Sequence, residues 1–205
     1  PKFSDHTLLG LHQTDPNAGL SAFETSGLFI RELDNRFGEA FVQFVEEREL
    51  FGTLKLQQGA IDRIVDGAMN LSRVHEHESD LAQQIELHME TLRRTRRKRL
   101  AHGVFRAHNI LANTNGDICV VDFGESIGMS SPFNDLTTLM LGTDTREQVQ
   151  AILDGYGRID EAEMPEYRFW EFLNSVFDMT HPFRPDTENT QKRIERVRNI
   201  MGGQS

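Results

Sequence analysis

The sequence predicts an α+β fold that is mainly helical and contains one β-hairpin. Apolar residues recur at helical spacing in segments on both sides of the chain's centre, which favours amphipathic helices. Between these segments, the runs "NILA" and "ICVVDF" are separated by the polar turn "NTNGD", a pattern typical of a hairpin. With 205 residues, of which 38% are hydrophobic and 26% charged, the chain is long enough for one substantial domain or two small lobes.

The first 37 residues are expected to contain short apolar runs and turns. The stretches "DPNAG" and "TSG" are turn signals, and "GLFIREL" (27–33) is interpreted as a strand. Helices are expected over residues 39–56, 61–72 and 81–92, the last of which precedes the basic run "RRTRRKR" (93–99). The helix over 61–72 carries a stripe of small and apolar residues along one face: Ile61, Ile64, Val65, Ala68, Met69 and Ser72.

After the hairpin the pattern becomes helical again. One helix is expected to bury Val149, Ile152, Leu153 and Tyr156, and another Trp170, Leu173 and Phe177. The tail "TQKRIERVRNIM" (190–201) is typical of a polar amphipathic helix. The aromatic residues of the second helix are interpreted as core, or in part as the lining of a substrate pocket: Phe169, Trp170, Phe172 and Phe177.

Charge and cysteine content limit the classes of partner and compartment. The formal net charge of −10 argues against binding of nucleic acid or anionic membranes, because their phosphates would be repelled. The single cysteine, Cys119, excludes an intrachain disulfide and a cysteine-based zinc site, and is expected to be a small core residue in a buried strand. With no apolar run near 18 residues and no leader, a reducing cytoplasm is the predicted location.

The hairpin also predicts a metal site. Asn109 precedes its first strand and Asp122 follows its second, so the fold-back is expected to bring an amide oxygen and a carboxylate together. Such hard oxygen donors suit Mg²⁺. The pair His75 and His77 is not interpreted as a metal site, because successive helical positions point in different directions.

Two motifs around this hairpin resemble a known family. "HGVFRAHN" (102–109) and "VVDFGES" (120–126) are similar to the catalytic loop and metal motif of the protein-kinase-like superfamily, in its aminoglycoside phosphotransferase and choline kinase-like branch. "AMNLSRVHE" (68–76), "SPFNDLTTL" (131–139) and "AILDGYG" (151–157) resemble further segments of that family in the same order. The resemblance covers roughly residues 60–175.

The resemblance implies a fold and a set of site residues. Residues 38–205 would form a kinase-like helical C-terminal lobe, and residues 1–37 a remnant of the N-terminal lobe or hinge. Asn109 and Asp122 would hold Mg²⁺ and, with Phe123 and Gly124, the ATP side of the site. His102 would brace the catalytic loop, and Asp135 would occupy a structural acidic position.

The sequence departs from the family at the catalytic base. Val104 stands where the family has the aspartate that accepts the proton of the substrate hydroxyl, and a valine side chain has no polar atom. A water molecule or another side chain of the loop, Arg106 or His108, could substitute in part. Phosphate transfer is therefore expected to be impaired.

The N-terminal residues depart as well, since they hold no convincing Gly-rich loop and only Lys2 before residue 55. In the favoured alignment, "GLFIREL" is the strand entering the hinge. In the other, residues 8–23 form a degenerate phosphate-loop hairpin, Arg31 replaces the phosphate-binding lysine, and Glu46 or Glu47 is its helical ion-pair partner.

Three functions remain open at this level. The first is an ATP-dependent phosphotransferase acting on a small-molecule hydroxyl or a protein. The second is a pseudokinase-like regulatory or interaction module, and the third is a fragment of a larger kinase, suggested by the initial Pro1. The basic run 93–99 is interpreted as a solvated helix face, or alternatively as a docking patch for an acidic partner.

Overall fold

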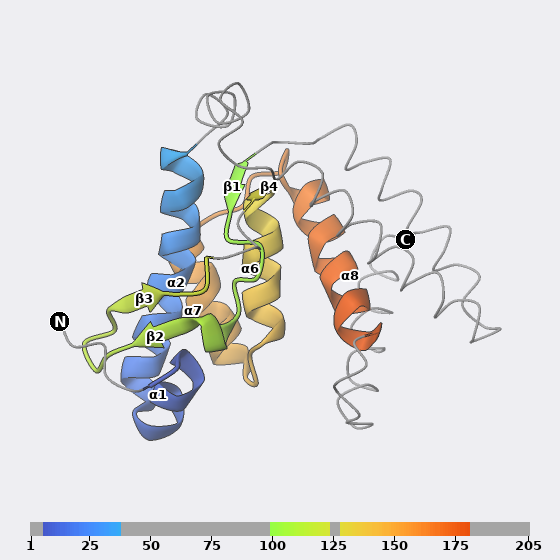
Figure 1. Ribbon diagram of the computed structural model, residues 1–205. Helices are drawn as coiled ribbons and strands as arrows, with labels where there is room; N and C mark the ends of the chain where they lie inside the picture. Colours follow the sequence, from blue (N-terminus) through green and yellow to red (C-terminus); the bar gives the residue numbers. More distant parts are fainter. Residues whose placement is uncertain (1–5, 38–98, 124–127, 181–205) are drawn as a thin grey trace. The chain divides into compact units, whose positions relative to one another are not determined.

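The computed structural model describes residues 6–37, 99–123 and 128–180 (Figure 1). These residues fall into two compact units. The first contains residues 6–37, 99–123 and 128–160, and the second contains residues 161–180. Among the described helices, none has the length and apolar character that crossing a bilayer requires.

The N-terminal residues form two consecutive helices, α1 (Leu8–Thr14) and α2 (Pro16–Arg36), drawn in blue in Figure 1. Asp15 separates them and begins the second, because its Oδ1 accepts a hydrogen bond from the Ala18 N–H at 3.1 Å. Pro16 occupies the first turn of α2, where its missing N–H costs nothing. The sequence "DPNAG" is therefore a helix start and not a loop.

The strand predicted over residues 27–33 is wrong, because this stretch continues α2. Its apolar and small residues follow a helical period, which a short apolar run does not distinguish from a strand. The buried positions of α2 are Ala18, Gly19, Ala22, Phe23, Ser26, Gly27, Ile30 and Asp34.

Both alignments of the N-terminal residues are overturned by these helices. Residues 8–23 are helical and form no phosphate-loop hairpin. Arg31 lies on α2, where its guanidinium covers the ring of Tyr156 at 4.9 Å and donates to the carbonyl of Arg158 at 3.3 Å. It anchors one helix to another and does not replace a strand lysine. The domain boundary between residues 37 and 38 stays a prediction.

The predicted hairpin is confirmed, with shorter strands than the sequence indicated. β2 (Ile110–Ala112) pairs antiparallel with β3 (Ile118–Val120), and the register places Ile110 opposite Val120. Asn113 closes the turn, since its Oδ1 accepts from the N–H groups of Asn115 and Asp117. β3 is half-buried, so the expectation of a buried strand with Cys119 in the core is wrong.

Two further backbone pairings connect the hairpin to its surroundings. The Ala112 N–H donates to the carbonyl of His6 at 3.1 Å, and Thr7 forms a bridge with Leu111, so the N-terminal segment lies along β2. β1 (Arg99–Ala101) pairs antiparallel with β4 (Gly128–Ser130). The 3₁₀ turn η1 (Ala107–Asn109) leads directly into β2.

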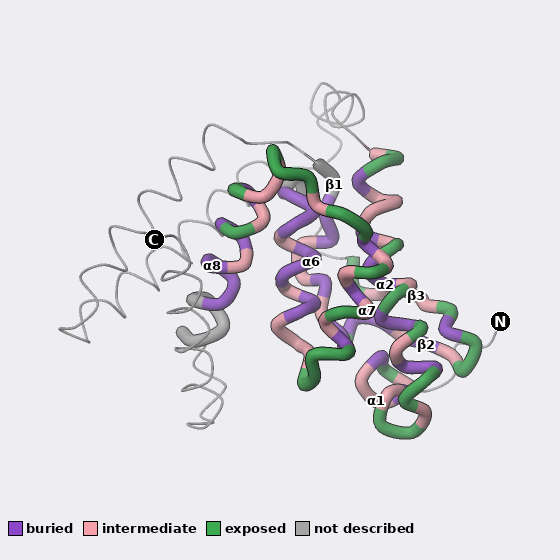
Figure 2. Tube along the Cα trace, turned by 180° about the vertical axis from the view of Figure 1, so that it is seen from behind, coloured by how far each residue is buried: buried purple, intermediate pink, exposed green. Residues whose placement is uncertain are grey.

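Three helices follow the strands: α6 (Pro132–Leu141), α7 (Arg146–Tyr156) and, in the second unit, α8 (Met164–Thr180). These confirm the helices predicted around residues 149–156 and 170–177. In Figure 2, α6 is buried along most of its length. Its buried positions are Pro132, Phe133, Asp135, Leu136, Thr137, Leu139 and Met140.

Helices α2 and α7 lie side by side at very short range (Figures 1 and 2). A Cβ atom on Gly27 would collide with the carbonyl oxygen of Ile152 and lie 2.8 Å from the Tyr156 nitrogen. A Cβ atom on Gly155 would collide with the carbonyl oxygen of Glu24. The two backbones therefore touch because each helix presents a glycine to the other.

Several predictions lie outside the described residues. These are the helices over 39–56, 61–72, 81–92 and 190–201, the segment 68–76, residues 93–98 of the basic run, Glu46, Glu47, His75, His77 and Gly124. Within the described ranges, the mainly helical α+β composition with one hairpin is confirmed.

Candidate active site

A buried carboxyl group holds the start of the candidate catalytic loop (residues 102–109). Asp135 on α6 accepts the backbone N–H of His102 at 2.6 Å on one oxygen and that of Gly103 at 2.8 Å on the other. Burial raises the pKa of Asp135 to about 7, against the lowering effect of these two donors. The loop can turn directly afterwards because Gly103 has a φ of 86°.

The loop closes around the backbone of Val104. Its carbonyl oxygen accepts the Arg106 N–H at 2.9 Å and the Asn109 side-chain Nδ2 at 3.0 Å. Asn109 is 6% exposed, and this bond fixes the orientation of its amide. Because the nitrogen is committed to a carbonyl, Oδ1 is the atom that can serve a cation.

The hairpin brings the backbone of Asn109 next to that of Val121, the residue before Asp122. The Val121 N–H donates to the carbonyl of Asn109 at 2.9 Å, which extends the β2–β3 pairing by one step. Asp122 directly follows Val121. It therefore lies one residue beyond the position that pairs with Asn109, the last residue of the loop. The expected fold-back of the hairpin is therefore observed as backbone pairing between Asn109 and Val121.

Asp122 has an unusual backbone conformation. Its φ of 63° is in the left-handed region, and among the described non-glycine residues it alone has a positive φ. Aspartate tolerates this conformation better than most residues, and such conformations are concentrated at ligand sites. The side chain is exposed, so a ligand can reach it.

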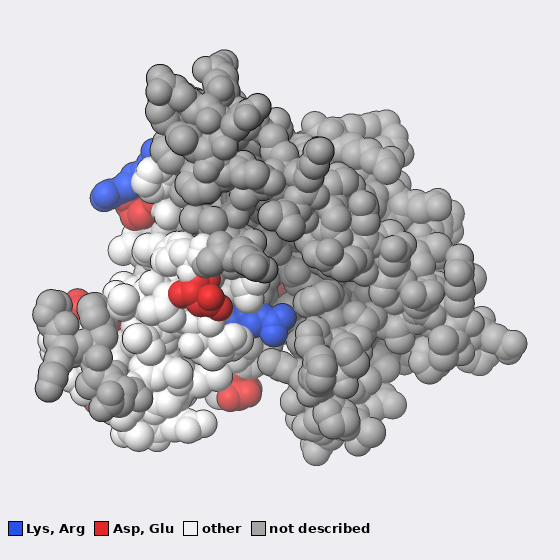
Figure 3. Space-filling view, viewed as in Figure 1, with Lys and Arg blue, Asp and Glu red and all other residues white. Residues whose placement is uncertain are grey.

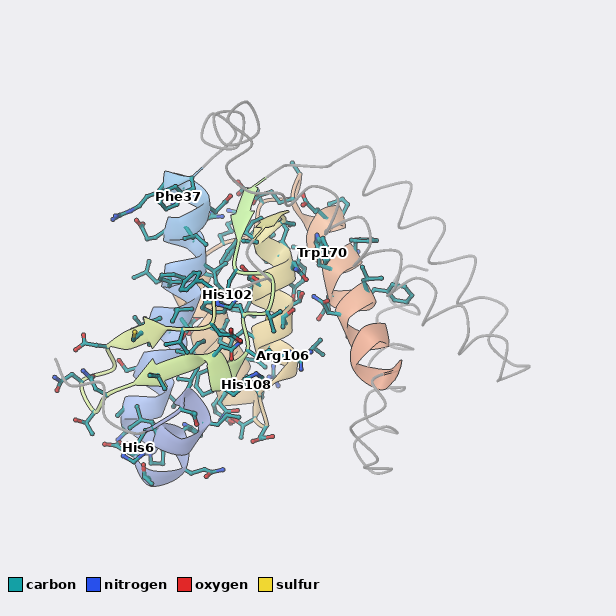
Figure 4. The ribbon with its side chains drawn as sticks, in the orientation of Figure 1. His6, Phe37, His102, Arg106, His108 and Trp170 are labelled. Carbon is teal, nitrogen blue, oxygen red and sulfur yellow. The ribbon has the colours of Figure 1, made fainter. Side chains whose placement is uncertain are left out.

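His102 joins the loop to the turn. Its ring is fully buried, Nε2 donates to the carbonyl of Val121 at 3.0 Å, and Nδ1 accepts the Val104 N–H at 3.4 Å. The ring also packs edge-on against Phe123, with centroids 4.7 Å apart. Through these contacts His102 connects the start of the loop to Val121 and Phe123 (Figure 4).

The two other predicted residues of the loop, Arg106 and His108, lie on either side of Ala107. Arg106 is half-buried, and a guanidinium carries hydrogen-bond donors and no acceptor, so its side chain does not suit the role of a base. His108 is exposed and lies in the 3₁₀ turn η1, which leads into β2 (Figure 4).

The chemistry of these two donors is compatible with a magnesium ion. Mg²⁺ is commonly held by one or two protein oxygens together with phosphate oxygens and water, and Asn109 Oδ1 and the Asp122 carboxylate would supply two. Among the described residues there is no group of three His, Cys, Asp or Glu side chains that could hold a metal by themselves. The described residues also include no lysine, because the chain's four lie at 2, 55, 98 and 192.

On the face of the molecule shown in Figure 3, the charged side chains of the described residues do not form one patch. Figure 3 shows separate acidic and basic groups scattered over the visible face. An extended cationic surface of the kind that nucleic acid requires is not present on the described part of that face.

Sequence reasoning missed two phenylalanines behind the loop. Phe105 is fully buried and packs edge-on against His102, with centroids 5.6 Å apart. Phe29 of α2 stacks on Phe105 at 5.7 Å with an interplanar angle of 9°. Phe105 could have been suspected as the large aromatic residue of the loop, but no local signal connects it to Phe29.

A comparison of the chain with curated proteins found no match. Among solved structures, a choline/ethanolamine kinase family protein from Mesorhizobium loti is similar, with 16% sequence identity and a TM-score of 0.47. The match covers 92% of this chain and 64% of that protein's chain.

The family assignment rests on a match over most of the chain. Residues 6–170 match the family described as APH, phosphotransferase enzyme family. This range includes the catalytic loop, the hairpin, the Asp122 turn and Asp135. The chain therefore belongs to the phosphotransferase enzyme family, on the protein-kinase-like, aminoglycoside phosphotransferase side that its motifs indicated.

Proposed function

We propose that the protein transfers the γ-phosphate of ATP to a hydroxyl acceptor, with Mg²⁺ held by Asn109 and Asp122, and that Val104 slows this transfer. The observation that carries the proposal is the hydrogen bond from the Val121 N–H to the Asn109 carbonyl at 2.9 Å. It keeps the loop of Val104 and the turn of Asp122 adjacent, as phosphate transfer requires. Membership of the phosphotransferase family supports the general reaction class.

In this proposal the magnesium ion and the protein have different parts in the reaction. When bound, Mg²⁺ would neutralise charge on the phosphate oxygens. The Asn109 amide oxygen and the Asp122 carboxylate would hold this ion, and Asp135 fixes the loop. The acceptor hydroxyl must also lose a proton, for which Val104 offers no acceptor. Loss of a general base reduces rates on the order of 10²- to 10⁴-fold.

The proposed acceptor is a small-molecule hydroxyl, with a protein hydroxyl as the alternative. The acidic chain with its single cysteine supports placing this activity in a reducing cytoplasm. A screen of hydroxyl compounds for ADP release would identify the acceptor class.

A second candidate is a binding module without turnover. It is favoured by the apolar Val104 and by the absence of lysine from the described residues. Under this candidate the protein binds Mg·ATP or a partner and transfers nothing.

Replacement of Val104 separates the two candidates. The backbone of this residue is fixed through its carbonyl, so an aspartate there would project from the position the family uses. We expect Val104→Asp to raise Mg-dependent ADP release on the order of 10²-fold or more, measured by a coupled assay on the full chain. Val104→Asn is the matched control, because it has the same size and no basic carboxylate.

The binding measurement uses calorimetry with Mg·ATP. Asp122→Ala is expected to remove the Mg-dependent part of the affinity. If Val104→Asp binds Mg·ATP but stays inactive, the module without turnover is favoured. If neither the natural chain nor Val104→Asp binds Mg·ATP, both nucleotide-based proposals are refuted.

A further inference from the structure

Four rings form a continuous row from helix α2 to the Asp122 turn. Phe29 stacks on Phe105 at 5.7 Å, Phe105 packs edge-on against His102 at 5.6 Å, and His102 packs against Phe123 at 4.7 Å. Phe105 and His102, in the middle of the row, are fully buried. Because these interior rings cannot move independently of their neighbours, the position of Phe29 restricts that of the whole row.

The row ends at the backbone that carries Asp122. His102 Nε2 donates to the carbonyl of Val121 at 3.0 Å, and Val121 in turn donates to Asn109. A shift of the His102 ring therefore disturbs the hydrogen bond immediately before Asp122. Phe123, which follows Asp122, packs its ring against His102. The residues on both sides of Asp122 therefore contact His102.

The other end of the row is fixed by α7. Gly27 brings α2 into backbone contact with Ile152, and Arg31 covers the ring of Tyr156. At 100° per residue, positions 27 and 31 lie about 40° apart on the helix, whereas position 29 lies about 200° from position 27. One side of α2 is thus held by α7 while the opposite side presents Phe29 to Phe105.

We infer that Phe29 is a positioning residue for the Asp122 turn, acting through Phe105 and His102. Helix α2, which sequence reasoning assigned to a strand or a phosphate loop, is thereby a support of the active site. This inference rests on the proposed function for the role of Asp122, but its geometric part does not.

Hydrogen exchange tests the geometric part in the full chain without nucleotide. Phe29→Ala removes the first ring, and we expect exchange of the Val121 amide to become about three- to tenfold faster, the factor that corresponds to one aromatic pair. Amides of α7, such as that of Tyr156, serve as the internal reference and should change less. A merely structural role would accelerate both regions equally.

Two control variants are available on the same helix. Leu28→Ala alters the neighbouring residue, whose side chain is 49% exposed, and should leave Val121 exchange unchanged. Phe29→Tyr keeps the stacked ring and should restore the natural rate. Unchanged Val121 exchange in Phe29→Ala, or equal acceleration in Leu28→Ala, would overturn the inference.

Nucleotide binding tests the functional part. The ratio of the ATP dissociation constants without and with Mg²⁺ measures how well the turn holds the ion. We expect Phe29→Ala to lower this ratio about three- to tenfold, and Leu28→Ala to leave it unchanged. A natural chain with no Mg-dependent binding would refute the proposed function, while the exchange result would still decide whether Phe29 positions the turn.

Discussion

At the scale of single residues, both oxygens of Asp135 hold the candidate catalytic loop in place. Each accepts one backbone N–H, from His102 and from Gly103. In Asp135→Asn one of these oxygens becomes an amide nitrogen, which cannot accept, so a buried N–H loses its partner. We expect the free energy of unfolding at pH 5.5 to fall by about 1 to 3 kcal/mol, measured by urea denaturation.

The control for this change is an exposed aspartate of the same structural unit. Asp154 accepts a hydrogen bond from Gln150 at the surface of α7. Asp154→Asn should change the free energy of unfolding by less than about 0.5 kcal/mol. Equal effects of the two substitutions would contradict the role assigned to Asp135.

At the scale of elements, the contact between α2 and α7 depends on glycine. Alanine is the better helix former, by about 1 kcal/mol, so Gly27→Ala and Gly155→Ala would stabilise isolated helices. In the protein the added Cβ would collide with the carbonyl oxygens of Ile152 and Glu24. We expect each substitution to lower the free energy of unfolding by about 1 to 3 kcal/mol, because the helices must move apart.

Gly10→Ala on α1 is the matched control. Its added Cβ would meet only the end of the Thr7 side chain, at 3.3 Å. The gain in helix propensity should then offset the small contact, and urea denaturation should show little change. Destabilisation by Gly10→Ala as large as that by Gly27→Ala would show that helix α2 has no special need for glycine.

The elements that sequence reasoning predicted correctly are those with local signals. The polar turn "NTNGD" specifies the β2–β3 hairpin because Asn113 and Gly116 supply its hydrogen bonds and its positive φ. The strand predicted over residues 27–33 was wrong for the opposite reason. Taken locally, Gly27 suggests a turn. In the folded protein the backbone of α7 lies against Gly27, and this contact has no signal in the local sequence.

As with the elements of the fold, only part of the candidate site could be predicted from the sequence. The motifs identified the loop, the turn and Asp135, since their order and spacing follow the family pattern. The row from Phe29 to Phe123 joins residues almost a hundred positions apart, and no local pattern specifies such a pairing. The departure from the family pattern at the position of its catalytic aspartate, in contrast, is visible in the sequence as Val104.

At the scale of the whole molecule, Asp135 makes stability depend on pH. Its pKa is raised from 3.8 to about 7 in the folded protein, mainly by burial. Between these values the folded state binds more protons than the unfolded chain, so the contribution of Asp135 to stability is fully present below pH 4 and is lost as the pH approaches 7. Each pH unit inside this window corresponds to at most about 1.4 kcal/mol.

This pH dependence can be isolated by comparing variants. The histidines and other carboxyl groups are shared by the natural chain and Asp135→Asn, so their titration largely cancels in the difference between the two free energies of unfolding. We expect that difference to shrink by up to about 2 kcal/mol between pH 5.5 and pH 7, because only the natural chain has a carboxyl group to ionise at this position. Asp154→Asn retains Asp135 and should follow the natural chain at every pH. If the difference between Asp135→Asn and the natural chain is constant, or grows as the pH rises, the carboxyl group is already ionised at pH 5.5. The two backbone donors, and not burial, would then determine its charge.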